Sequence, residues 1–137
     1  MGTRGWFVVG ALMAGLAVAV SAYGAHGIKP KVDKGQIDAQ RLEDFEIAAR
    51  NHMIHAIALV LAGLVGRVGN STWSIHVAGA AFLLGILLFC GGLYGYALSD
   101  NRDYLSAAPA GGISFMVGWA ALAVAGWKSF AARQVSS

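Results

Sequence analysis

The sequence predicts an all-α integral membrane protein, a bundle of four transmembrane helices with an amphipathic interfacial helix between the first and the second. Of the 137 residues, 57% are hydrophobic and only 12% are charged, about half the charged fraction of a soluble domain. The apolar residues fall in four blocks, near residues 5–27, 51–68, 73–98 and 107–128. Each block is long enough to cross a hydrocarbon core of about 30 Å as a helix of roughly 20 residues. We therefore expect one transmembrane domain over residues 1–137.

The first block carries small residues along one face of its helix. Ala11, Gly15 and Ala19 follow one another at four-residue steps. Such a stripe lets the backbone of another helix approach closely and gain contacts that lipid does not supply better. We expect Pro30 to end this helix, because proline lacks the N–H that a helix interior requires.

The chain between the first two blocks is polar, and from about residue 36 its apolar residues return with helical spacing. Leu42 and Phe45 share one face, whereas Glu46 and Arg50 stand four residues apart on the other, where they can form an ion pair. We interpret residues 36–50 as an amphipathic helix that lies at the membrane interface and runs into the second transmembrane helix. The alternative is a solvated extension of the second transmembrane helix.

The third and fourth blocks also contain small residues at helical spacing. Gly91 and Gly95 form one pair, Gly85 follows Ala81 by four positions, and Gly118 follows Ser114 in the same way. We predict that Gly85, Gly91, Gly95 and Gly118 pack against neighbouring helices. Pro109 suits the first turn of the fourth helix, where its missing N–H has no cost.

Four crossings place both chain termini on one side of the membrane and the two longer connections on the other. The basic residues are scattered over termini and connections, and the net charge is only +3. Anionic lipid headgroups explain such residues, so we expect membrane lipids and no nucleic acid among the partners. The distribution of basic residues between the two sides is too even to fix the orientation.

Several polar side chains converge on the side of the longer connections. The predicted cluster consists of His26, His55, Tyr94 and Ser114, and His52 lies near it. Polar groups at membrane depth are costly unless they are paired or face a cavity, so such a convergence is a candidate site. The spacing of His52 and His55 could hold two ligands of a metal, and His26 with His55 could ligate haem. The simpler interpretation is that His26 and His55 make hydrogen bonds between helices and that His52 faces the headgroups.

The sequence contains no pattern that indicates an enzyme. All seven acidic residues lie in 33–46 or at positions 100 and 103, outside the apolar blocks, which argues against an ion-coupled transporter. No nucleophile stands beside a base, no phosphate-binding loop is present, and no third ligand completes a metal site. We therefore expect no catalytic residues, no metal and no cofactor.

Four motifs resemble the YgdD-like small inner-membrane proteins, the family grouped as domain of unknown function 423. They are AYGAHG at 22–27, HAIAL at 55–59, LLFCGGLYGYAL at 87–98 and PAGGISFMVGW at 109–119. Because they occur in order over nearly the whole chain, the resemblance is specific. It implies a four-helix protein of the bacterial inner membrane, with relatives in mitochondria, and no established activity.

The family pattern is carried onto eleven positions of this chain: Gly24, His26, Gly27, His55, Gly92, Tyr94, Pro109, Gly111, Gly112, Gly118 and Trp119. The chain departs from the pattern at Asn51 and His52, where the resemblance leads us to expect Tyr and Gln. The departure reduces the support for His52 and His55 as a shared site.

These observations favour a non-enzymatic membrane protein that acts as an accessory or assembly subunit of a larger complex or associates with itself. The support is the abundance of small-residue stripes combined with little chemistry inside the membrane. The alternative is a protein that binds or transports a lipid or small molecule at the cluster of His26, His55, Tyr94 and Ser114.

Overall fold

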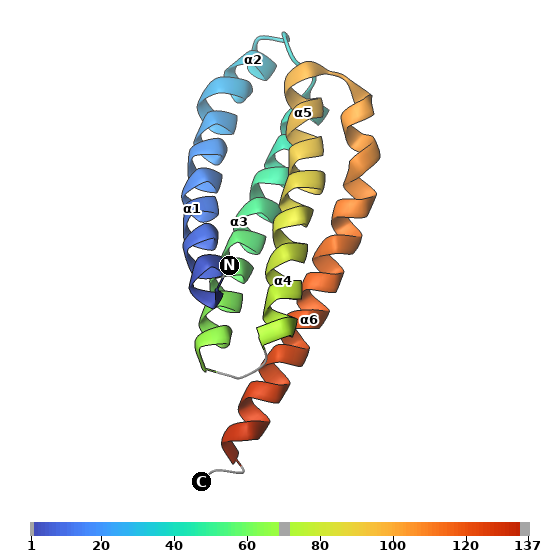
Figure 1. Ribbon diagram of the computed structural model, residues 1–137. Coiled ribbons are helices and arrows are strands. Elements are labelled where there is room, and N and C mark those ends of the chain that lie inside the picture. Colours follow the sequence, from blue (N-terminus) through green and yellow to red (C-terminus); the bar gives the residue numbers. More distant parts are fainter. Residues whose placement is uncertain (1, 69–71, 135–137) are drawn as a thin grey trace.

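The chain folds into long helices that run up and down the molecule (Figure 1). The structure is a computed structural model, and it describes residues 2–68 and 72–134. The elements in chain order are α1 (Thr3–Tyr23), the π-helical turn η1 (Gly24–Ile28), α2 (Lys29–Asp33), α3 (Ala39–Val68), α4 (Thr72–Gly85), the π-helical turn η2 (Ile86–Cys90), α5 (Gly91–Ser99), the 3₁₀ turn η3 (Arg102–Ala107) and α6 (Ala108–Gln134). All of these elements are helical, which confirms the predicted all-α class.

Within the described ranges, four helical segments are long and apolar enough to cross a membrane: Thr3–Asp33, Ala39–Val68, Trp73–Ser99 and Arg102–Ser129. The first segment joins α1, η1 and α2, and the third joins α4, η2 and α5. Each segment contains most of one predicted apolar block, so the predicted multi-pass membrane protein is confirmed. Both chain termini lie at one end of the bundle, and the turns that follow α2 and α5 lie at the other (Figure 1).

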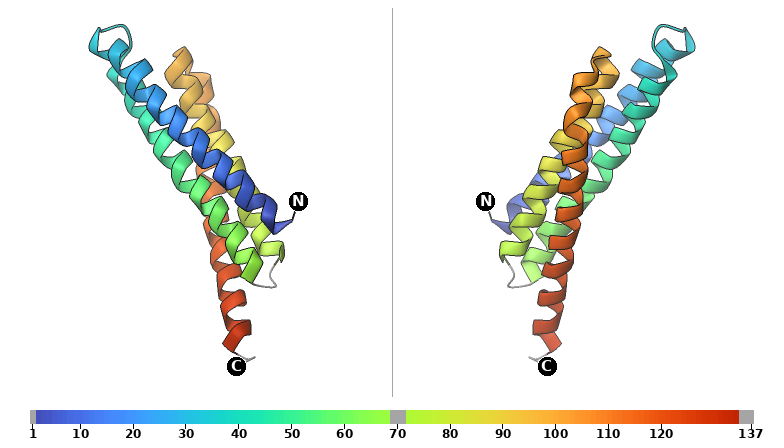
Figure 2. Two further views of the ribbon diagram at one scale, coloured as in Figure 1. Left: turned by 90° about the vertical axis from the view of Figure 1, so that its left-hand side faces the viewer. Right: turned by 90° about the vertical axis from the view of Figure 1, so that its right-hand side faces the viewer.

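The helices pack as two pairs, α1 with α3 and α4 with α6, and α3 contacts both α1 and the second pair. α1 packs along α3, and α6 packs along α4 and η2, while α3 also contacts α4 and α5. The two pairs lie close together near the chain termini and lean apart toward the opposite end (Figure 2). The outer faces of α1 and α6 are therefore left largely uncovered within the described chain.

Two glycines allow α1 and α3 to approach closely. A Cβ atom added at Gly10 would lie 2.6 Å from the backbone nitrogen of Val60, and one added at Gly63 would lie 2.6 Å from that of Phe7. Atoms in real structures do not come so close, so a side chain at either glycine would push the helices apart.

The segment that joins the first two spans differs from the prediction at Pro30. The first helix does not end at Pro30 but continues through the π-helical turn η1 to Asp33. Pro30 lies in the first turn of α2, where its missing N–H is tolerated. The predicted amphipathic helix belongs to α3, which runs without a break from Ala39 to Val68, so the structure agrees with the alternative of an extension of the second span. Phe45 and Ala48 of this segment are buried in the bundle, so it extends the second span.

The predicted packing positions divide into two groups. Cβ atoms added at Gly85, Gly95 and Gly118 would lie within 2.6 Å of aromatic rings. The rings belong to Phe115, Tyr104 and Phe82, respectively. Gly15, Ala19 and Gly91, in contrast, are exposed, and a Cβ atom at Gly15 or Gly91 would meet nothing within 4 Å. Spacing alone identifies a small-residue face but not whether a helix of the same chain covers it.

Candidate functional site

His55 of α3 lies at the centre of an aromatic cluster that joins three spans. Its ring stacks on Phe115 of α6 with centroids 3.4 Å apart and planes inclined by 8°. Its Nδ1 lies 2.8 Å from the carbonyl oxygen of Asn51, and the indole Nε1–H of Trp119 donates to its Nε2 at 3.3 Å. A carbonyl oxygen only accepts, so Nδ1 carries the proton and Nε2 is the acceptor. Both nitrogens of the neutral ring are therefore engaged: Nδ1 bonds within α3, and Nε2 holds α3 against α6.

His52 lies one turn earlier on α3 and faces α5. Its exposed fraction is 3%, so the expectation that it faces the headgroups is wrong. Its Nδ1 lies 3.4 Å from the hydroxyl of Tyr94, and the Tyr94 ring packs against Phe45 with centroids 4.9 Å apart. The other ring nitrogen, Nε2, is buried without a hydrogen-bond partner in the described part of the chain. The packed rings of Phe45 and Tyr94 make this face of α3 part of the protein interior.

Ser114 of α6 makes a contact between helices of a different kind. Its hydroxyl donates to the carbonyl oxygen of Ala81 on α4 at 2.8 Å, and the side chain is buried. Ser114 directly precedes Phe115, which stacks on His55, so both contacts fix the same turn of α6. Hydrogen bonds of this type contribute to helix association where water is excluded.

The structure does not bring the four predicted cluster residues together. His55 and Ser114 make contacts at the same turn of α6, whereas Tyr94 contacts His52, one turn earlier on α3. His26 lies in η1 with its side chain exposed and makes no hydrogen bond with a described residue. The expected hydrogen bond from His26 between helices is therefore not formed, because the π-helical turn directs this position outward.

Phe115, Trp119 and Asn51 complete the cluster, and sequence reasoning did not assign them to it. Trp119 is one of the positions that the family pattern carries, which is the signal that could have indicated its role. Trp119 is also half-exposed, with Phe82 packed against its ring edge at a centroid distance of 5.2 Å. The arrangement supplies rigid contacts between helices. No carboxylate orients either histidine among the described contacts, and the described residues contain no group of three or more potential metal ligands.

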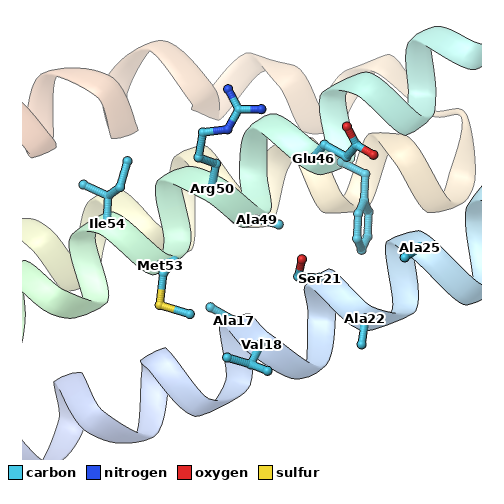
Figure 3. A pocket seen from close by; sticks show the side chains of 11 residues that line it. Ala17, Val18, Ser21, Ala22, Ala25, Glu46, Ala49, Arg50, Met53 and Ile54 are labelled. Atoms are coloured by element: carbon cyan, nitrogen blue, oxygen red, sulfur yellow. The ribbon is translucent and has the colours of Figure 1, made fainter.

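A second feature is an open groove of about 700 Å³ between α1 and α3, which we call the α1–α3 groove. Its α1 wall is lined by small side chains from Ala17 to Ala25, and its α3 wall extends from Phe45 to Ile54. Figure 3 shows Ser21 pointing from α1 toward α3, while Glu46 and Arg50 extend outward from α3. Contrary to the prediction, Glu46 and Arg50 form no ion pair in the described structure.

Four apolar spanning helices with buried histidine and aromatic contacts between them define a multi-pass integral membrane protein. A sequence model of the family described as "Protein of unknown function (DUF423)" matches residues 20–112, which is more than half of the chain. The chain belongs to this family, as its motifs predicted.

The relatives of this chain include membrane proteins from two bacterial genera. The UPF0382 membrane protein SERP0230 of Staphylococcus epidermidis is 32% identical over 90% of this chain and 95% of its own length. The UPF0382 membrane protein YwdK of Bacillus subtilis is 30% identical over 90% of this chain and 96% of its own length. No solved structure matches the chain.

Proposed function

We propose that this protein is a non-enzymatic accessory or assembly subunit of a larger complex in the bacterial cytoplasmic membrane. Relatives from bacteria that are named membrane proteins support the location. Helical spans, which are the usual form in cytoplasmic membranes, agree with it. The outer face of α1 is the surface that packs against the neighbouring subunit.

The observation that carries the proposal is the stripe of Ala11, Gly15 and Ala19, which is exposed along α1. A Cβ atom at Gly15 would meet nothing within 4 Å, so the fold of this chain does not need glycine there. Lipid chains gain little from small residues, whereas a second helix can approach them closely. A small-residue face that the chain itself leaves open therefore fits a helix from another subunit.

The buried cluster supports a structural role and not a reaction. Both ring nitrogens of His55 are occupied, Nδ1 by a carbonyl of its own helix and Nε2 by the Trp119 indole that joins α3 to α6. Ser114 is likewise engaged with Ala81, and His26 lies outside the cluster. The alternative function, binding or transport of a small molecule at His26, His55, Tyr94 and Ser114, has less support because these side chains do not line one cavity.

The test is extraction of the tagged full-length protein from its native membrane in mild detergent, followed by native gel electrophoresis and mass spectrometry. We expect a second integral membrane protein in stoichiometric amount. The Gly15→Leu variant should lose this partner, because leucine blocks the close approach. Ala123→Leu places the same side chain at an exposed position of α6 and is the control that should retain it.

Three results would count against the proposal. Extraction of the wild-type protein as a monomer, with no second protein bound, would show that it has no stable partner. A homo-oligomer without a second protein would replace the accessory role with self-association. Equal partner recovery from Gly15→Leu and Ala123→Leu would show that the α1 stripe is not the contact surface.

A further inference from the structure

The α1–α3 groove has a polar end and an apolar end. Along α3, Glu46 and Arg50 lie toward the turn that joins α2 to α3, whereas Met53 and Ile54 lie toward the chain termini. The opposite wall consists of the small side chains of Ala17, Val18, Ser21, Ala22 and Ala25. A ligand that fits this groove therefore has a charged head and an apolar body.

The charged end of the groove lies at a boundary of the apolar layer. Arg50 and Arg67 are both exposed on α3 and stand 17 positions apart. At 1.5 Å per residue this separation is about 26 Å, close to the thickness of a hydrocarbon core of about 30 Å. The two arginines thus mark the two edges of the hydrocarbon region, where the phosphate groups of lipids lie. Met53 and Ile54 lie on the inner side of Arg50, within the layer.

The protein itself does not satisfy the two charges. Within the described ranges, neither Glu46 nor Arg50 makes a hydrogen bond or an ion pair. Some of the other charged side chains at this end have a partner within the protein: Lys29 binds Asp33 at 3.0 Å, and Arg41 donates to the carbonyl of Ala97 at 2.9 Å. Charges at the edge of a membrane are stabilised by headgroups when no protein group pairs with them.

We propose that the α1–α3 groove binds a phospholipid with a zwitterionic headgroup that ends in a primary amine. The lipid phosphate contacts the guanidinium of Arg50, which can form two parallel hydrogen bonds with it. The ammonium contacts the carboxylate of Glu46, and one acyl chain follows the groove past Ala22 and Met53. Side chains four residues apart on a helix are about 6 Å apart, a separation that a short linker between phosphate and amine can span.

The charge pattern selects this headgroup over the other common ones. An anionic headgroup would place its surplus negative charge beside Glu46, which opposes binding. A choline headgroup has the right charges, but its quaternary nitrogen has no N–H to donate to a carboxylate. The groove volume of about 700 Å³ lies within the range of about 300–1,000 Å³ that small-molecule sites occupy.

The test uses the purified full-length protein and native mass spectrometry in detergent micelles. The protein is exposed to an equimolar mixture of phosphatidylethanolamine, phosphatidylcholine and phosphatidylglycerol with identical acyl chains. We expect wild-type protein to retain phosphatidylethanolamine preferentially. Glu46→Gln and Arg50→Gln should each lower its retention about three- to fivefold, as expected for partly exposed charge pairs. Arg102→Gln alters an exposed arginine of η3 that lies outside the groove and should leave retention unchanged.

A second pair of variants tests the apolar part of the groove. Ala22 and Ala123 are both exposed alanines of spanning helices, but only Ala22 lines the groove. Ala22→Trp should displace the lipid, whereas Ala123→Trp should retain it. The proposal is overturned if wild-type protein binds the three lipids equally, or if neither Glu46→Gln nor Ala22→Trp changes retention. It is also overturned if a photoreactive residue at position 50 captures a protein subunit and no lipid in native membranes.

Discussion

Trp119 on α6 donates its indole N–H to Nε2 of His55 on α3, and this 3.3 Å hydrogen bond joins two helices that are far apart in sequence. The same imidazole donates from Nδ1 to the carbonyl of Asn51 and stacks on Phe115. His55 is therefore held in one tautomer by contacts on both sides. His52, one turn away, differs because its buried Nε2 has no partner among the described residues.

The same substitution should have a larger effect at His55 than at His52. His55→Phe leaves the indole N–H of Trp119 without its acceptor and should lower the free energy of unfolding by about 1–3 kcal/mol. His52→Phe removes an unpaired buried nitrogen but also the 3.4 Å contact with the Tyr94 hydroxyl, so the two effects offset each other and the net loss should be below about 1 kcal/mol. Unfolding in mixed micelles of dodecyl maltoside and SDS, followed by circular dichroism, measures both variants. A larger loss for His52→Phe than for His55→Phe would contradict the described hydrogen bonds.

The contact between α1 and α3 predicts that two glycines respond differently to alanine. A Cβ atom at Gly63 would lie 2.6 Å from the backbone nitrogen of Phe7, so Gly63→Ala forces α1 and α3 apart. We expect it to cost about 1–3 kcal/mol of stability, as overpacking does. Gly15→Ala on the open face should be neutral or stabilising, because alanine is the better helix former. The same unfolding assay applies, and equal losses from both variants would show that the α1–α3 contact is looser than described.

The spans could be predicted from the sequence because hydrophobic length is a local property of the chain. The close approach of α1 to α3 could not be predicted from the sequence. Both Gly10 and Gly15 lie in the same apolar block, and only the fold shows that Gly10 meets α3 while Gly15 faces outward. Small residues at every fourth position identify one face of a helix, but they do not show which neighbouring helix covers that face.

The candidate site shows the same limit in its histidines. The sequence identified His55 and Ser114 as polar groups at membrane depth, and the structure places both in contacts between helices. It did not separate exposed His26 from buried His52, because burial depends on the π-helical turn η1 and on the packing of α5 against α3. Neither effect is encoded in a spacing of a few residues.

The burial of Cys90 predicts that thiol reagents label it slowly in the folded state. Its side chain is fully buried in the core between the spans. A thiol reacts only where a reagent can reach it, so N-ethylmaleimide should modify native Cys90 far more slowly than the SDS-unfolded chain. The control is Ala110→Cys in a Cys90→Ala background, because Ala110 is exposed near the start of α6. Mass spectrometry of timed samples gives both rates, and equal rates for Cys90 and the cysteine at position 110 would contradict its burial.

Substitution of Arg41 should lower the stability of the fold, whereas substitution of a matched exposed arginine should not. Its Nε–H donates to the carbonyl of Ala97 at 2.9 Å, and one guanidinium nitrogen lies 3.7 Å from a carboxylate oxygen of Asp100. The last carbonyls of a helix have no partner within the helix, so this arginine satisfies one of them at the end of α5 and fixes α3 beside it. Arg41→Met retains most of the apolar stem but removes the donor, and we expect it to lower the free energy of unfolding by about 1–2 kcal/mol.

The control for Arg41 is Arg102→Met, which removes the same charge from an exposed position in η3 at the same end of the bundle. It should change the free energy of unfolding by less than about 0.5 kcal/mol, as exposed substitutions do. Hydrogen exchange adds a local readout, because loss of the Arg41 contact should increase exchange of the amides in the last turn of α5. If Arg41→Met and Arg102→Met have equal effects in both measurements, the contribution of Arg41 comes from its charge and not from its hydrogen bond to Ala97.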